Sequence, residues 1–93
     1  MGKRYWEDLT EGERFTCGPV AFDRGGIIAF GKEYDPWPFH VDEEAAGRSI
    51  FGGLIASAFQ TVSACTRVVV EANSDVALLS GLAIDEVRTF HPV

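Results

Sequence analysis

Apolar residues dominate residues 54–71 and recur at the three- and four-residue spacing that gathers side chains on one side of an α-helix. We therefore predict a helix from Leu54 to about Glu71, opened by the turn residues Phe51-Gly52-Gly53. Its apolar positions are Leu54, Ile55, Ala58, Phe59, Val62, Cys65, Val68 and Val69. They cover more than one narrow stripe, so we expect this helix to be largely buried.

A shorter helix is predicted to begin after Asp23, whose side chain is a typical N-cap, and to include apolar residues at positions 27, 28 and 30. Gly25-Gly26 destabilises it by about 1 kcal/mol per glycine relative to alanine, so it needs tertiary support. It should end before Asp35, because a residue that precedes a proline, here Pro36, avoids the α region.

Asp42 is predicted to be a second N-cap, followed by Glu43 and Glu44. Carboxylates in the first turn of a helix are stabilised by the helix dipole. We therefore assign these three acidic residues to capping and solvation rather than to catalysis.

Two segments have β-type patterns. Residues 13–20 alternate around Phe15 and Cys17 and are predicted to form a strand that ends at Gly18-Pro19. Residues 76–93 are rich in β-forming residues, with an alternation that slips between Ile84 and Val87 and suggests a bulge. The apolar positions of this second segment are Leu82, Ile84, Val87 and Phe90. Together with the helices, these segments predict a small α+β domain.

Length and composition narrow the function classes. At 93 residues the chain is at most one small domain, and its 46% hydrophobic content argues against disorder. The net charge of −6, with scattered basic residues, disfavours binding to nucleic acid. Cys17 and Cys65 have no metal-ligand spacing. Without an apolar N-terminal segment or a long apolar run, we expect a cytoplasmic protein that has no membrane contact.

The first of the two histidines follows a carboxylate by five residues in Asp35-Pro36-Trp37-Pro38-Phe39-His40. This spacing does not share a helix face, and the two prolines stiffen the backbone, so we predict a rigid loop. A carboxylate and a histidine held in fixed relation can serve as a general acid/base pair. Alternatively, Asp35 is a turn residue and His40 a packed, hydrogen-bonded ring; the spacing alone leaves both interpretations open.

Further motifs follow in order. Pro38 lies two residues before His40, the acidic-then-alanine run Asp42-Glu43-Glu44-Ala45-Ala46 comes next, and Phe51-Gly52-Gly53-Leu54-Ile55-Ala56-Ser57 leads into the apolar helix. The chain thereby resembles the MaoC-like dehydratase family, which includes R-specific enoyl-CoA hydratases. This resemblance implies a hotdog fold, in which an antiparallel sheet wraps a long central helix. Family members continue into further strands after residues like 85–93, so we expect residues 1–93 to be a single, C-terminally shortened domain, incomplete in one chain.

The resemblance also implies an activity. It is that of a hydro-lyase, which adds water to a 2-enoyl thioester or removes it from a 3-hydroxyacyl thioester. Asp35 and His40 would activate the water, and backbone N–H groups near Ser57 and Ala58 would hold the thioester oxygen. Trp37 stands where these hydratases usually carry an amide residue, and Ala58 where the family's oxyanion-binding glycine lies, which implies a changed acyl pocket. This chemistry needs no metal or redox cofactor.

The expected partners follow from the same resemblance. The substrate would be a thioester of coenzyme A or of acyl carrier protein, and a homodimer or higher homo-oligomer would cover the incomplete sheet. Two alternatives are an inactive hotdog module that dimerises or binds acyl thioesters, and a hotdog thioesterase; the pattern of Asp35 and His40 is more similar to the hydratases. His91 is expected to be an exposed or edge-strand residue without a catalytic role.

Overall fold

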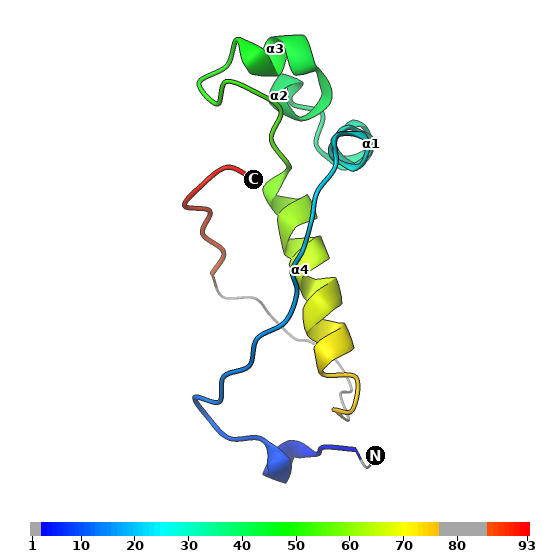
Figure 1. Ribbon diagram of the computed structural model, residues 1–93, viewed down its shortest axis with the longest axis vertical. Coiled ribbons are helices and arrows are strands. Elements are labelled where there is room, and N and C mark those ends of the chain that lie inside the picture. Colours follow the sequence, from blue (N-terminus) through cyan, green and yellow to red (C-terminus); the bar gives the residue numbers. More distant parts are fainter. Residues whose placement is uncertain (1–2, 77–85) are drawn as a thin grey trace.

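Five helical segments make up the secondary structure of residues 3–76 and 86–93, which the computed structural model describes (Figure 1). They are the 3-10 helix η1 (Trp6–Asp8) and the α-helices α1 (Arg24–Tyr34), α2 (Pro38–Val41), α3 (Glu43–Gly47) and α4 (Ala58–Ala72). The first three α-helices cluster at one end, and α4 runs away from them along the long axis (Figure 1). The radius of gyration is 16.7 Å, whereas a compact domain of this length has about 12 Å. The molecule is therefore elongated.

Helix α1 begins and ends where the sequence predicts. The Asp23 side chain accepts a hydrogen bond of 2.6 Å from the backbone N–H of Gly26, which confirms its N-cap role. At the other end, the Asp35 N–H donates to the Gly31 carbonyl at 2.9 Å, and Pro36 follows. The helix thus delivers Asp35 to its own C-terminal boundary.

The segment predicted to be a rigid loop contains the one-turn helix α2, so that prediction is incomplete. Pro38 occupies its first turn, where a missing N–H costs nothing and the fixed φ suits a helix. The Asp42 carboxylate then caps α3, accepting hydrogen bonds of 3.0 and 3.2 Å from the N–H groups of Glu44 and Ala45. This confirms the second predicted N-cap.

Helices α1 and α2 approach each other closely at Gly31. A Cβ atom at this position would lie 2.9 Å from Val41 Cγ1 and 3.0 Å from both Cβ and the carbonyl oxygen of His40. Only a glycine fits such a contact without displacing the neighbouring backbone. Gly31 is therefore what allows α2 to bring His40 against the helix that ends at Asp35.

Helix α4 begins at Ala58, four residues after the predicted start. The preceding residues are not helical, because the Ile55 carbonyl, which a helix from Leu54 would pair with the Phe59 N–H, accepts from His40 Nδ1 at 2.7 Å. Their N–H groups also have partners outside the helix. The Ile55 N–H donates to the Phe39 carbonyl at 3.1 Å, and the Ala56 N–H donates to the Val93 carbonyl at 2.8 Å. Ser57 takes the N-cap position instead, and its hydroxyl accepts a hydrogen bond of 3.2 Å from the Phe59 N–H.

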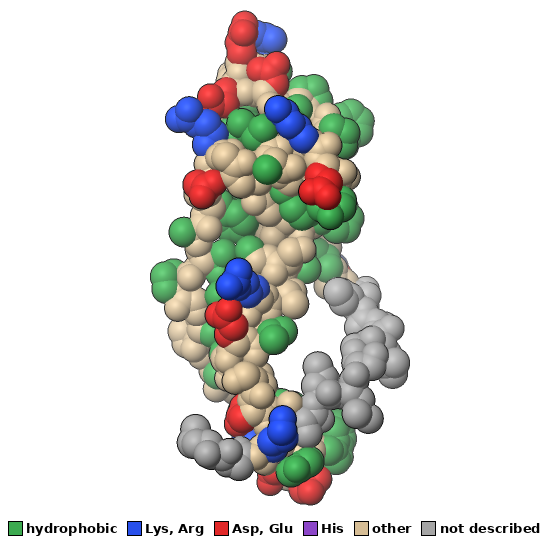
Figure 2. All heavy atoms as spheres, turned by 90° about the vertical axis from the view of Figure 1, so that its right-hand side faces the viewer, with side chains coloured by type: hydrophobic (Ala, Val, Ile, Leu, Met, Phe, Trp, Pro, Cys, Tyr) green, Lys and Arg blue, Asp and Glu red, His purple; other side chains and the backbone are tan. Residues whose placement is uncertain are grey.

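The predicted burial of this helix is wrong for the described chain. No residue of α4 is buried, and the Phe59 side chain is 73% exposed. The flanking segments run beside α4 as extended chain and do not form a covering sheet in the described part (Figure 1). Figure 2 shows the result on one face, where hydrophobic side chains lie open to solvent among scattered charges of both signs. Among residues 3–76 and 86–93, the buried apolar residues are Ile27, Ala46 and Ala56.

The predicted sheet is not present within residues 3–76 and 86–93. Residues 13–20 are extended and nearly all exposed, with no partner strand among the described residues, so the predicted first strand is not formed. The β-type pairing that is present is an isolated parallel bridge between Arg4 and Val76. Leu82, Ile84 and most of the predicted bulge lie outside the described residues, and residues 86–93 contain no strand.

The N-terminal segment is fastened to the far end of α4 by Arg4. Its guanidinium donates to the Asp75 carboxylate at 2.6 and 3.0 Å and to the Asn73 side-chain carbonyl at 3.0 Å. Its backbone N–H also donates to the Asp75 carbonyl at 2.7 Å. The hydrogen bond from Arg4 lowers the pKa of the Asp75 carboxyl below its ordinary value and raises the pKa of Arg4.

Candidate active site

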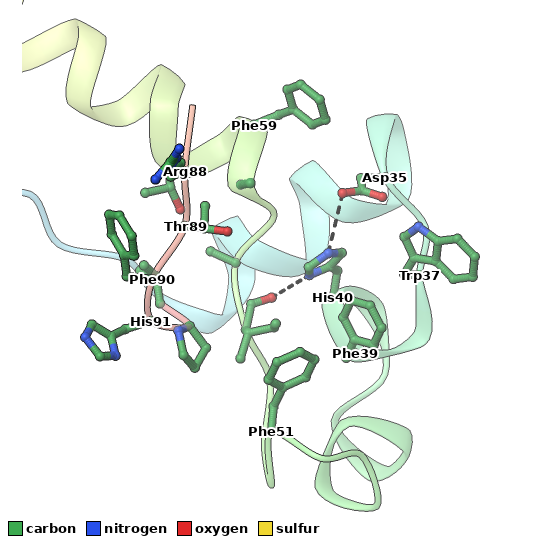
Figure 3. Close-up of a pocket in the computed structure, with 16 residues that line it drawn as sticks. Asp35, Trp37, Phe39, His40, Phe51, Phe59, Arg88, Thr89, Phe90 and His91 are labelled. Atoms are coloured by element: carbon green, nitrogen blue, oxygen red, sulfur yellow. Dashed lines mark hydrogen bonds and ion pairs between the residues drawn. The ribbon is translucent and has the colours of Figure 1, made fainter. Parts of the chain in front are cut away.

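Asp35 and His40, the predicted catalytic pair, lie together. The distance from His40 Nε2 to Asp35 Oδ2 is 3.4 Å (Figure 3). The imidazole side chain is only 7% exposed, and the carboxylate is 22% exposed. The end of α1 holds the carboxylate and α2 holds the ring, so the close packing at Gly31 sets their separation.

A second contact fixes which ring nitrogen of His40 carries the proton. Nδ1 lies 2.7 Å from the backbone carbonyl oxygen of Ile55. A carbonyl oxygen only accepts hydrogen bonds, so Nδ1 must donate, and in the neutral ring Nε2 is then an acceptor. In this neutral form the Nε2 lone pair faces the Asp35 carboxylate, and the two acceptors can share one donor with two hydrogens.

Ser57 is nearly inaccessible, at 1% exposed, and its hydroxyl donates a hydrogen bond of 2.7 Å to Asp35 Oδ2. The Ser57 hydroxyl oxygen also caps α4 by accepting a hydrogen bond from the Phe59 N–H. These two contacts commit the Ser57 hydroxyl to Asp35 and to the helix, so any contact of Ser57 with the thioester oxygen stays a prediction for its backbone N–H. The sequence contains no signal for this pairing, because it joins residues 22 positions apart.

Ala58 and Trp37, the other predicted binding residues, both line the cavity beside the pair. Ala58 is the first residue of α4, and the N–H groups of a first helical turn have no intrahelical acceptor. Trp37 precedes α2, is 63% exposed, and stacks on Phe39 with ring centroids 6.3 Å apart. The structure thus brings together all five residues selected from the sequence, with Ser57 in a supporting position.

The cavity has a volume of about 670 Å³, within the range of small-molecule sites. Its second wall is the extended C-terminal segment, which no sequence motif had linked to the site. The residues that this segment contributes are Arg88, Thr89, Phe90, His91, Pro92 and Val93 (Figure 3). The backbone hydrogen bond between Ala56 and Val93 holds the two walls together. His91 is exposed, as expected, but lines the cavity.

The described residues lack a metal-binding cluster and a membrane-spanning helix. Residues 3–76 and 86–93 contain no group of three or more His, Cys, Asp or Glu side chains arranged to hold a metal ion. Over the same ranges, no helix has both the length and the apolar character needed to cross a bilayer.

The chain is similar in sequence and in structure to known proteins. Over 65 residues the chain is 34% identical to the uncharacterized protein YdeM of Bacillus subtilis, covering 70% of this chain and 46% of YdeM. The crystal structure of a MaoC-like dehydratase from Rhodospirillum rubrum is 45% identical, with a TM-score of 0.63, over 72% of this chain and 46% of that one.

The X-ray structure of a monoamine oxidase regulatory protein from Archaeoglobus fulgius matches the whole chain, with a TM-score of 0.88 and 26% identity, over 64% of its own length. The chain thus spans about half to two thirds of the length of these relatives. Residues 10–93 match the sequence model of the MaoC like domain. With the predicted motifs, the Asp35 and His40 geometry and these similarities in agreement, the chain belongs to the MaoC-like domain family.

Proposed function

We propose that this chain carries the water-activating site of a hydro-lyase that acts on 2-enoyl and 3-hydroxyacyl thioesters. The observation that carries the proposal is the pair of acceptors, Asp35 Oδ2 and His40 Nε2, 3.4 Å apart at the wall of a cavity. A water molecule has two hydrogens and can donate one to each. Its oxygen then keeps its lone pairs free to attack carbon.

The chemistry balances without any redox step. In hydration, the pair removes a proton from the water while the oxygen bonds to C3, and the C2=C3 double bond becomes an enolate. The same pair then returns a proton to C2. In dehydration the steps reverse, so that the C2 proton and the C3 hydroxyl leave as water. One acid/base device therefore serves both directions.

The enolate intermediate places negative charge on the thioester oxygen, which requires a donor. The Ala58 N–H is suited to this role because it stands at the positive end of the α4 dipole. Preorganised backbone donors of this kind contribute about 10²–10³-fold to rate in other enzymes. The cap at Ser57 keeps this helix end in place while its hydroxyl orients Asp35.

The direct test follows the conjugated enoyl-thioester absorbance after the protein is mixed with crotonyl-CoA. We expect the wild-type protein to cause loss of this absorbance. Asp35→Asn and His40→Gln should each slow the loss by about 10²–10⁴-fold, the usual contribution of a general acid or base. Asp23→Asn is the matched control, because it removes a carboxylate of α1 while keeping an N-cap. Unchanged turnover in Asp35→Asn would refute the mechanism.

The exposed face of α4 supports a second candidate, a module that binds acyl thioesters without converting them. A cavity whose central helix is largely open to solvent excludes water poorly. Saturable binding of butyryl-CoA by a folded sample that does not hydrate crotonyl-CoA would favour this module. For either function we propose that further copies of the chain cover α4, and that coenzyme A or acyl carrier protein carries the thioester.

A further inference from the structure

We propose that this pocket selects thioesters whose acyl tail is a flat aryl group attached at C3, as in a 3-aryl-acryloyl thioester or its 3-hydroxy form. The inference deepens the proposed hydro-lyase function and rests on it for the position of the reacting carbon. It depends on the aromatic side chains around the Asp35 and His40 pair, which the proposed chemistry does not use.

Aromatic rings form a continuous band beside the catalytic histidine. Phe39 lies edge-on to His40, with centroids 4.6 Å apart and an interplanar angle of 79°. Trp37 stacks on Phe39 at 6.3 Å and 9°, and Phe51 meets Phe39 edge-on at 5.3 Å and 66°. Figure 3 shows these rings next to the His40 imidazole. All of them line the cavity, as do Phe59 and Phe90.

The reacting geometry places the acyl tail against this band. Water attacks C3, so C3 must lie beside Asp35 and His40. The substituent at C3 is the acyl tail, and the band begins at the ring of His40 itself. The group next to C3 is therefore the part of the substrate closest to Phe39 and Trp37.

Two physical effects then favour binding of a substrate with a flat ring over one with a saturated chain. Aromatic faces and edges attract one another through their quadrupoles, beyond the burial of apolar area. A rigid aryl group also loses less conformational freedom on binding than an alkyl chain of similar size. The exposed Trp37 and Phe59 side chains leave ring surface open to such a ligand.

The reaction with this substrate balances in the same way as before. Conjugation of the double bond with the aryl ring favours the alkene, so the measurable direction is dehydration. The C2 proton and the C3 hydroxyl leave a 3-hydroxy-3-arylpropionyl thioester as water, and a 3-aryl-acryloyl thioester forms. No oxidant or reductant takes part.

Binding is tested with two unreactive thioesters of equal carbon number, 3-phenylpropionyl-CoA and 3-cyclohexylpropionyl-CoA. Calorimetry on wild type should give about three- to tenfold tighter binding of the phenyl compound, the range expected for aromatic pairing. Trp37→Ala should remove most of this preference, and Trp37→Phe should retain it. Because the chain has two tryptophans, Trp6→Phe leaves Trp37 as the single reporter, whose fluorescence should change with the phenyl ligand.

Equal affinities for the two ligands, a preference that Trp37→Ala leaves intact, or binding of neither would overturn the proposal. Trp6→Ala is the matched control, because Trp6 lies in η1 and does not line the cavity. Failure here is separable from failure of the proposed function. Asp35-dependent hydration of crotonyl-CoA without aryl preference would support the hydro-lyase and reject the aryl pocket. Trp37-dependent aryl preference without turnover would support the aryl pocket and reject the hydro-lyase.

Discussion

The Ser57 hydroxyl donates its hydrogen bond to Oδ2 of Asp35, the same oxygen that lies 3.4 Å from His40 Nε2. A serine that caps a helix therefore also orients the carboxylate of the candidate active site. Because Ser57 is almost completely buried, no solvent molecule can take over either contact without rearrangement.

Replacing Ser57 by alanine should lower both stability and turnover. Loss of the cap costs about 0.5–2 kcal/mol, measurable by denaturant unfolding. Loss of the contact to Asp35 should lower kcat for crotonyl-CoA more than it raises KM, since in the proposed mechanism the carboxylate acts on water rather than on substrate binding. Ser57→Thr keeps a hydroxyl and should restore much of kcat. A stability loss with unchanged kcat would leave Ser57 with a capping role alone.

Substitution of Gly31 by alanine should displace His40 and so disturb its position relative to Asp35. The added methyl would press against Val41 and His40 at 2.9–3.0 Å, and overpacking of this kind costs about 1–3 kcal/mol. We expect weaker stability together with a loss of hydration activity. Gly25→Ala in the same helix is the control, because its nearest neighbour would lie at an ordinary 3.7 Å. That control should be stabilised by about 0.5–1 kcal/mol.

Acid should release the contact between Arg4 and Asp75. The pKa of Asp75 is lowered from 3.8, chiefly by the hydrogen bond from Arg4, so the folded state binds the proton less tightly than the unfolded state. The stabilisation is then fully present above pH 3.8 and is lost as the pH falls through the lower folded pKa. Asp75→Asn should lower the thermal midpoint at neutral pH, and its difference from wild type should shrink in acid.

A double-mutant cycle checks the cause of that effect. Arg4→Gln should reproduce the pH-dependent loss, and the double variant with Asp75→Asn should add little to either single change. Additive losses would show that Asp75 gains its stabilisation from another group.

The open face of α4 should make copies of the chain associate. Val69 lies on the apolar side with Val62 and Cys65, around a second hollow of about 340 Å³. Val69→Lys should weaken association in light scattering by placing a charge at this surface. Ser63→Lys, at an exposed position of the same helix, should leave association unchanged. A monodisperse monomer over a wide concentration range would reject this expectation.

Features that depend on neighbouring residues were predictable from the sequence. Asp23 and Asp42 are N-caps as expected, because each meets its partner N–H groups within three residues. The boundary of α1 at Asp35 follows from the proline after it. Asp35 and His40 are also close in the chain, so one short segment brings both to the same place.

Features that depend on distant contacts were not predictable. The helix pattern from Leu54 to Ser57 is overridden because the Ile55 carbonyl accepts from His40 and the Phe59 N–H donates to the Ser57 hydroxyl. Pro38 was expected to stiffen a loop, whereas it starts a helix, since proline suits both. The apolar pattern of α4 shows which side favours burial but not whether a sheet covers it.

Helix α4 has different attachments at its two ends, with Ser57 and Asp35 at its start and Asn73, Asp75 and Arg4 at its finish. Its 15 residues separate these attachments by about 22 Å, well beyond the distance at which substitutions usually interact. The contacts of Arg4 at one end of α4 and the contacts of Asp35 at the other end can therefore change independently during evolution. Changes near Arg4 can tune how firmly the far end is held, while the geometry around Asp35 and His40 stays the same.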